Sequence, residues 1–137
     1  MAVYNKFQSF VEAVALKKHN LGADVLTIAL TNALNAPVAT NSVLADLTQI
    51  AYTNLSARVP TITSCVQTAG TLKLILADLV LTATGAVAPF RYVVLYNATA
   101  TNGELIAWWD YGSEITLANG DTFTLDFDNV NGVLQIA

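Results

Sequence analysis

The feature that most constrains the fold is a series of short alternating apolar runs after residue 70, separated by turn residues. Leucines alternate with other residues from Leu72 to Leu76, and residues 90–97 are rich in aromatic and β-branched side chains. Strands repeated at intervals of about 8 to 12 residues are typical of β-sandwiches and barrels. The second half of the chain is therefore predicted to form antiparallel strands.

Two Asn-Gly pairs, at 119–120 and 131–132, mark turns within this series. Asn-Gly between alternating apolar runs is a strong signal for a β-hairpin, because both residues tolerate positive φ angles. After the first pair, Phe123, Leu125 and Phe127 alternate with polar residues and are expected to face the core. We therefore expect a hairpin at each Asn-Gly pair.

The N-terminal segment has helical rather than strand periodicity. Phe7, Phe10, Val11 and Val14 recur at the spacing that places side chains on one face of a helix, which predicts a helix over 5–19. From residue 24 the period changes to two, which predicts a strand.

The middle of the chain carries weaker signals. Residues 42–51 favour a short helix, because their apolar side chains fit one helical face. Residues 52–70 contain Pro60, Gly70 and many Thr and Ser residues, and are predicted to form an extended arm or loop. The whole chain, 1–137, has the size of one domain.

The composition predicts contacts with other protein. Charged residues make up 12% of the chain, against about 25% in an ordinary soluble domain. Such a chain has few hydrated groups to cover its surface, so we expect a homo-oligomer or a lattice component. The net charge of -4 lacks the basic excess that nucleic-acid binding needs. The formal charge of residues 1–91 is +2 (6 basic minus 4 acidic), and that of residues 92–137 is -6 (0 minus 6). This asymmetry either steers docking onto a basic surface or reflects aspartates that solvate turns and strand faces.

Catalytic signals are weak. His19 and Cys65 are the single histidine and cysteine, so the sequence supports neither a zinc cluster nor an intrachain disulfide. His19 is interpreted as a helix-end residue. The carboxylate pairs Asp110 with Glu114 and Asp126 with Asp128 suit solvated strand faces better than glycosidase chemistry. We expect no enzyme activity, no cofactor and no metal.

The sequence also lacks targeting signals. It shows no signal-peptide pattern, and its most apolar stretch is shorter than a membrane helix. We expect the protein to be made in the cytoplasm and not to associate with a membrane.

Aromatic residues are the best candidates for an interface. Trp108 and Trp109 are neighbours in a predicted strand, so one indole should enter the core while the other faces outward. The outward indole would be a protein anchor, a sugar-stacking platform, or a residue covered by the same chain. The candidate interface residues are Trp108, Trp109 and Tyr111, with Tyr52 and Arg58 in the arm.

Several strings together resemble a family of tailed-bacteriophage virion proteins. They are YNKFQSFVEAV (4–14), HNLGADVLTIALTN (19–32), FRYVVLYN (90–97), GELIAWWDYG (103–112), ITLANGDTFTLDF (115–127) and NGVLQI (131–136). The resemblance covers most of the chain outside roughly 41–71. It involves framework residues and brings no catalytic motif.

The resemblance implies a capsid decoration (cement) protein on the virion surface, made in the host bacterium. Such proteins have a β-sandwich or jelly-roll body, are commonly trimers, and stabilise the shell by binding copies of the major capsid protein. The expected fold is thus a mainly β, antiparallel sandwich with a short N-terminal helix. The alternatives are a receptor- or carbohydrate-binding module of a tail fibre or baseplate, and a small hydrolase.

Overall fold

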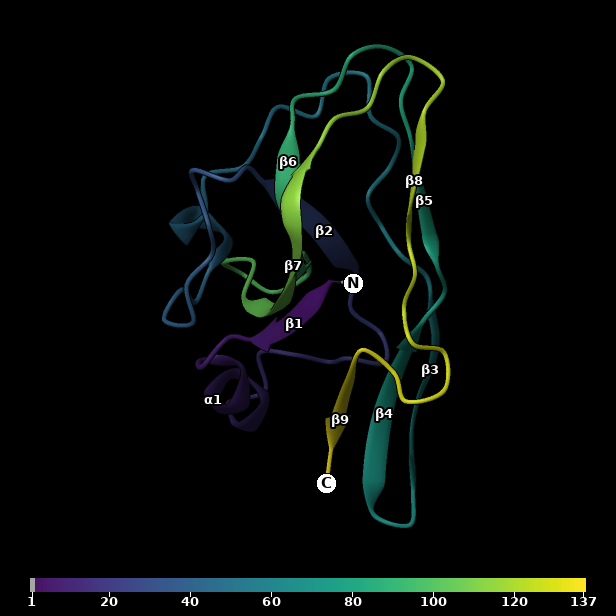
Figure 1. Cartoon of the computed structure of the whole chain (residues 1–137). Helices are drawn as coiled ribbons and strands as arrows, with labels where there is room; N and C mark the ends of the chain where they lie inside the picture. Colours follow the sequence, from purple (N-terminus) through teal and green to yellow (C-terminus); the bar gives the residue numbers. More distant parts are fainter. Residues whose placement is uncertain (1) are drawn as a thin grey trace.

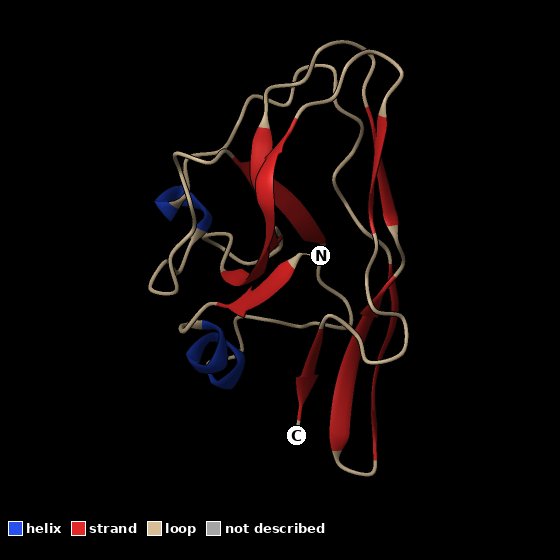
Figure 2. Ribbon diagram, viewed as in Figure 1, coloured by secondary structure: helices blue, strands red, loops and turns tan. Residues whose placement is uncertain are grey.

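The computed structural model describes residues 2–137, which are mainly β, as predicted (Figures 1 and 2). All strand pairings among them are antiparallel. The elements are β1 (Val3–Lys6), α1 (Phe10–Ala15), β2 (Leu26–Thr31), the 3-10 helix η1 (Leu44–Asp46), β3 (Ile62–Thr68), β4 (Thr71–Leu76), β5 (Leu79–Thr82), β6 (Phe90–Asn97), β7 (Leu105–Ile115), β8 (Thr122–Leu125) and β9 (Leu134–Ile136).

The largest sheet has four strands in the order β1-β7-β6-β2. The predicted strand at 90–97 is confirmed as β6, and it lies between β7 and β2. Its pairing with β7 shifts register between Leu95 and Tyr96 and between Phe90 and Tyr92. The second shift places Phe90 in the same apolar cluster as Val93 and Leu95 rather than with Tyr92.

Two narrower sheets lie beside the four-stranded one, in the orders β3-β4-β9 and β5-β8 (Figure 1). The chain passes from β4 to β5 through Ala77 and Asp78. The Asp78 carboxylate accepts a hydrogen bond from the backbone N–H of Phe127 at 2.9 Å, and thereby connects this bend to the segment after β8. The β3–β4 hairpin projects beyond the rest of the molecule (Figure 2).

The main core lies between the four-stranded sheet and the two narrower sheets. β2 and β6 contribute leucine, isoleucine and valine side chains from one side, and β4, β5 and β8 contribute leucines from the other. The largest fully buried members of this cluster are Leu26, Ile28, Leu30, Leu74, Leu76, Leu81, Phe90, Leu95, Ile106 and Leu125. Burial of this apolar area supplies the main favourable free energy of folding.

The opposite face of the four-stranded sheet carries a second, smaller core. Its centre is Phe7, whose ring lies 4.5 Å from that of Trp108. Leu44 and Leu47, in and after η1, pack against this cluster. Because both faces of the sheet are covered, all six residues of β2 are buried.

The helix predicted over 5–19 is much shorter in the structure. Of the predicted helical residues, 5 and 6 instead belong to β1, because the backbone of 3–6 pairs with β7 from Val3↔Asp110 to Lys6↔Ala107. The helix spans only Phe10–Ala15 and ends before Lys17, which has a positive φ of 62°. The short helix expected within 42–51 is the three-residue η1.

The arm predicted over 52–70 is also only partly correct. Residues 62–68 form β3, which pairs with β4 through a two-residue turn at Ala69 and Gly70. Residues 50–58 contain no strand and follow the outer edge of β2, where Ile28 N–H donates to the Arg58 carbonyl at 2.8 Å. The same segment reaches β5, since Ser56 N–H donates to the Thr82 carbonyl at 3.0 Å.

The two Asn-Gly pairs form turns, but neither joins strands that pair with each other. Gly120 and Gly132 both have positive φ angles, as the sequence predicts. However, β7 pairs with β6 and β1, whereas β8 pairs with β5 and β9 with β4. The predicted hairpins are therefore wrong, because the turns carry the chain from one sheet to another.

Candidate functional site

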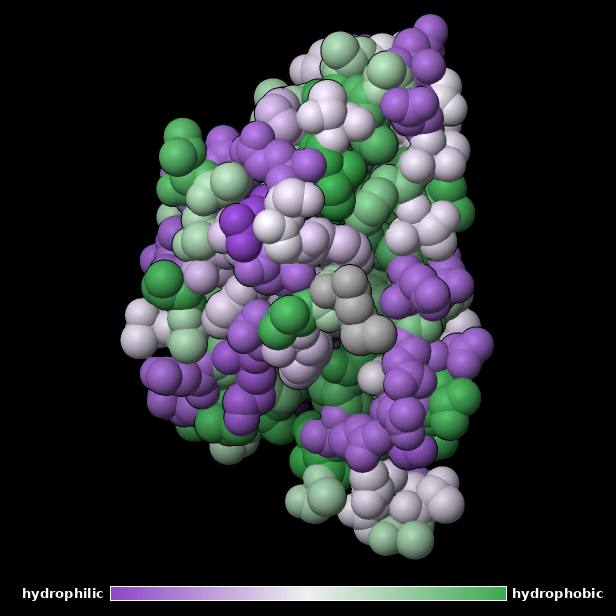
Figure 3. Space-filling view, in the orientation of Figure 1, coloured by the Kyte–Doolittle hydropathy of each residue, from purple (hydrophilic) through white to green (hydrophobic). Residues whose placement is uncertain are grey.

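The clearest concave surface is a groove between β7 and the chain that leaves β8. It consists of two adjoining hollows of about 580 and 320 Å³, and both are lined by Trp109, Asp126, Phe127 and Asp128. Hydrophobic residues lie between the four-stranded sheet and the β8–β9 connection, and mainly hydrophilic residues follow that connection (Figure 3). We call this surface the Trp109 groove.

Trp109 is held at the groove by strand pairing and by aromatic contacts. It lies in β7 opposite Tyr4 of β1 and Val93 of β6. The Tyr4 ring meets it edge-on at 5.5 Å between centroids, and the Phe127 ring lies at 5.7 Å. The indole is half-buried, so part of it is available to a ligand.

Tyr111 lies two residues further along β7 and lines the larger hollow. Its ring packs edge-on against Phe123 at 5.2 Å. Burial raises the pKa of the Tyr111 phenol, and the negative charge of Asp126 raises it further. The hydroxyl therefore stays protonated and neutral at physiological pH, next to a carboxylate.

Asp128 shapes the rim of the groove. Its Oδ1 accepts hydrogen bonds from the backbone N–H groups of Val130 at 2.8 Å and Asn131 at 2.7 Å, and its Oδ2 accepts one from the Asn131 side chain. These bonds hold the pKa of Asp128 below its usual value. The carboxylate thus stays ionised while it fixes the turn before β9.

Trp108 and Trp109 point to opposite faces, as their adjacency predicts. Trp108 packs on Phe7 in the smaller core and is only 8% exposed. The same chain therefore covers Trp108, and the structure separates it from the groove that Trp109 lines.

Tyr52 and Arg58, the candidates from the predicted arm, lie at the opposite edge of the four-stranded sheet. The Tyr52 hydroxyl accepts a hydrogen bond from Leu30 N–H at 2.9 Å and donates one to Gln49 Oε1 at 2.6 Å. Arg58 donates to the carbonyl of Ile28. Both side chains bind β2 within the molecule, so the structure does not bring them together with Trp109 and Tyr111.

A buried polar cluster around His19 was missed by the sequence reasoning. The Asn97 side-chain amide donates to Asp24 Oδ2 at 2.6 Å and lies 3.0 Å from His19 Nδ1. Burial lowers the pKa of His19, while the charges of Glu104 and Asp24 partly oppose that shift. The interpretation of His19 as a helix-end residue is wrong, because α1 ends at Ala15 and His19 lies beyond it. The sequence did not show its buried partners Asn97 and Glu104, which are distant along the chain.

The carboxylates considered for catalysis mostly hold structural bonds. Asp110 accepts two hydrogen bonds from Arg91, at 2.8 and 3.1 Å. These bonds hold the pKa of the Asp110 carboxyl below its usual value. Glu114 accepts a bond from Ala33 N–H at 3.2 Å. Within residues 2–137, no three His, Cys, Asp or Glu side chains are grouped as a metal site would need. The helices in this range are too short to cross a bilayer.

Comparison with known proteins adds no relative. No protein-family model, curated protein or solved structure matches this chain.

Proposed function

We propose that this chain is a non-catalytic structural protein of a tailed-bacteriophage virion, a decoration protein bound to the outer capsid surface. In this proposal its sheets form a jelly-roll-like sandwich, and it binds the major capsid protein and further copies of itself as a trimer. The framework strings quoted above support this assignment, together with a charged content of 12%.

The observation that carries the proposal is the projecting β3–β4 hairpin. β3 pairs only with β4 among the described strands, so its other edge presents unpaired backbone groups. Residues 59–72 contain no charged side chain, and Val66 at the middle of β3 is 61% exposed. In proteins that stay monomeric, exposed edge strands usually carry charges or prolines that block pairing with another chain. An uncharged, projecting edge strand suits docking on a protein lattice by strand addition.

Binding of many such copies would stabilise the shell without chemistry. A protein that binds the assembled shell more tightly than its dissociated subunits shifts the equilibrium toward the shell. Each contact can be weak, because a repetitive lattice offers many of them.

The test is binding to expanded capsid shells of the phage that encodes the chain. Wild-type protein should bind saturably and raise the melting temperature of the shells. Val66→Lys should weaken binding at least tenfold, whereas Val80→Lys, on β5 and 49% exposed, should bind like wild type. Shells whose occupancy and melting temperature do not change with wild-type protein would contradict the proposal. Light scattering of the free protein tests the trimer separately.

The Trp109 groove favours a second candidate, a receptor- or carbohydrate-binding module of a tail fibre or baseplate. Half-buried aromatic side chains next to carboxylates are suited to stacking on sugars and to hydrogen bonding with their hydroxyls. Glycan-array binding that is lost in Trp109→Ala would favour this candidate over capsid decoration.

A further inference from the structure

The Trp109 groove combines aromatic rings with negative charge. Trp109 and Tyr111 supply rings, Asp126 and Asp128 supply carboxylates, and no Lys or Arg among residues 2–137 lines either hollow. Aromatic faces attract cations through the ring quadrupole, and tryptophan does so most strongly. A groove with both features is complementary to a positively charged group.

We propose that the Trp109 groove receives an arginine side chain of the partner protein. This inference rests on the proposed function, because it names the chemistry of the partner surface that the chain contacts. In this arrangement the guanidinium plane lies against the exposed part of the Trp109 indole, and its N–H groups donate to Asp126. Arginine suits the site better than lysine, because a planar guanidinium both stacks on rings and donates two parallel hydrogen bonds to a carboxylate.

Asp126 is free to take this role. Its side chain is exposed, and none of the described residues donates a hydrogen bond or forms an ion pair with it. It lies close enough to Tyr111 for its charge to act on the phenol. By contrast, both oxygens of Asp128 already accept hydrogen bonds from its own turn. Asp126 is therefore the carboxylate that a guest can bind directly.

The charge of the surrounding chain favours the same guest. Residues 92–137 contain six acidic and no basic residues. β7, β8 and the β8–β9 connection, which form most of the groove, all come from this part of the chain. Lys73 of β4 lies at the rim, where it donates to the Val130 carbonyl at 3.2 Å and its charge acts on Asp128, but no described residue donates to Asp126. An excess of negative charge near a cleft raises the local concentration of cations and speeds their association.

Position also favours a guest from another protein. The groove lies at the β1 side of the four-stranded sheet, whereas residues 50–58 cover the β2 side. Arg58 is engaged at that covered edge, and Arg91 is paired with Asp110. Both arginines of the chain are therefore held in place by its own contacts.

The probe is the peptide acetyl-Gly-Arg-Gly-Arg-Gly-amide, compared with the same peptide containing citrulline. Citrulline keeps the shape of arginine and lacks its charge. Binding is followed by NMR through the indole N–H of Trp109. We expect the arginine peptide to bind about three- to tenfold more tightly than the citrulline peptide, as cation–π and exposed ion-pair contacts allow.

Two matched variants locate the effect. Asp126→Asn should remove most of the preference for arginine, whereas Glu12→Gln on α1 removes the same charge far from the groove and should retain it. Equal binding of the two peptides, or an unchanged Trp109 signal, would overturn the inference.

Capsid binding separates this inference from the proposed function. If wild-type protein binds shells and Asp126→Asn binds them equally well, the groove inference is wrong and the decoration role stands. If the arginine peptide occupies the groove but wild-type protein does not bind shells, the groove chemistry stands and the decoration role is wrong.

Discussion

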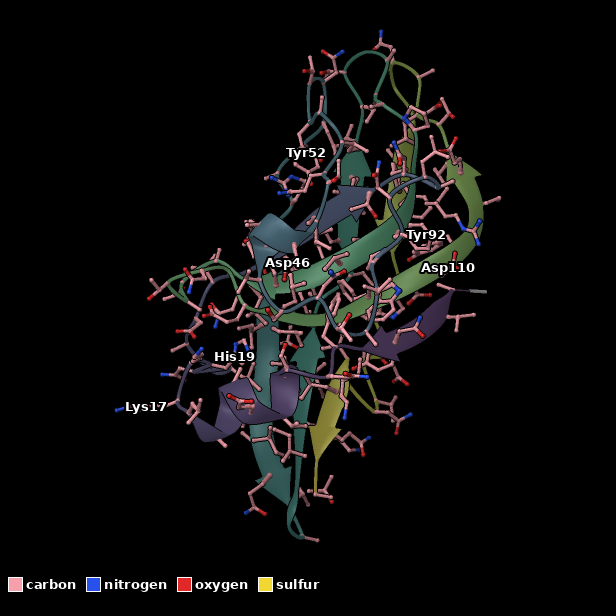
Figure 4. The ribbon with its side chains drawn as sticks, turned by 90° about the vertical axis from the view of Figure 1, so that its left-hand side faces the viewer. Lys17, His19, Asp46, Tyr52, Tyr92 and Asp110 are labelled. Carbon is pink, nitrogen blue, oxygen red and sulfur yellow. The ribbon has the colours of Figure 1, made fainter. Side chains whose placement is uncertain are left out.

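The guanidinium carbon of Arg58 lies 3.5 Å above the centre of the Tyr52 ring, and both side chains bind the outer edge of β2. This stacked pair gives β2 the hydrogen-bond partners that a further strand would otherwise supply. Covering an edge in this way removes a template for unwanted pairing. Figure 4 shows Tyr52 in the upper part of the molecule, well separated from His19 and Asp110.

Removing the Tyr52 hydroxyl should lower the stability of the protein, because this group bonds the outer edge of β2. Tyr52→Phe keeps the ring under Arg58 but leaves Leu30 N–H without its acceptor, which should lower the free energy of unfolding by about 1 to 2 kcal/mol. Urea denaturation measures the change. Tyr4→Phe is the matched control, since the Tyr4 ring is exposed at β1, and it should change stability by less than about 0.5 kcal/mol. Equal losses in the two variants would contradict this role for Tyr52.

His19 should make stability depend on pH in the mildly acidic range. Its pKa in the folded protein lies below the ordinary value of 6.5, so the unfolded chain takes up a proton first as the pH falls. The free energy of unfolding should therefore decrease from about pH 6.5 downward, until the folded protein is also protonated. Denaturation at a series of pH values measures this slope.

The control for the pH effect is His19→Gln, which should remove the slope between about pH 5 and 7, because His19 is the single histidine. NMR titration of the imidazole gives the folded pKa directly. A folded value above 6.5 would be incompatible with the burial described here.

Gly132 should tolerate a side chain much less well than Gly120. Both have positive φ angles, but a Cβ at Gly132 would lie 2.4 Å from the Leu74 carbonyl oxygen, whereas a Cβ at Gly120 would have no atom of the other described residues within 4 Å, its chain neighbours aside. Gly120→Ala should cost about 1 to 2 kcal/mol from the left-handed backbone alone. Gly132→Ala should cost clearly more, because β9 must also move away from β4. Thermal denaturation of the two variants makes the comparison, and similar losses would rule out the close approach.

The two tryptophans should differ in their contributions to stability. Trp108→Ala opens a cavity beside Phe7 and should cost about 3 to 5 kcal/mol. Trp109→Ala removes a half-buried ring at the groove and should cost about 1 to 2 kcal/mol. Urea denaturation followed by circular dichroism measures both, because fluorescence would change with the tryptophans themselves. The opposite order would reverse the assignment of the buried indole.

The sequence predicted best the strands whose pattern reflects burial on both faces. Residues 90–97 are apolar or aromatic at six of their eight positions, and β6 has the same bounds. It predicted worst the segments whose structure depends on distant partners. Residues 5 and 6 are strand rather than helix because β7, about a hundred residues away, pairs with them. β3 was missed because Thr, Ser and Gln suit an exposed edge strand as well as a loop.

The candidate site was predicted in part, and for a similar reason. The alternation of side chains in a strand separates Trp108 from Trp109, and it places Tyr111 on the same side as Trp109. The residues that meet Trp109 and Tyr111 across the groove were not predictable, because the turn at 119–120 was interpreted as a local hairpin. In the structure β8 lies across the core from β7, so Asp126 meets Trp109 from another sheet.

The covering segment at 50–58 has a consequence for how the molecule opens. Its Tyr52 and Arg58 bond to β2, while Ser56 bonds to Thr82 at the end of β5 and Asn54 bonds to Thr84 just beyond it. Separation of the layers along this side requires both sets of bonds to break together, whereas β1 is held by four residues of pairing. Amide hydrogens of β1 should therefore exchange with solvent before those of β2. Local unfolding then begins at β1, beside the Trp109 indole, and leaves the bonds between β2 and residues 50–58 intact.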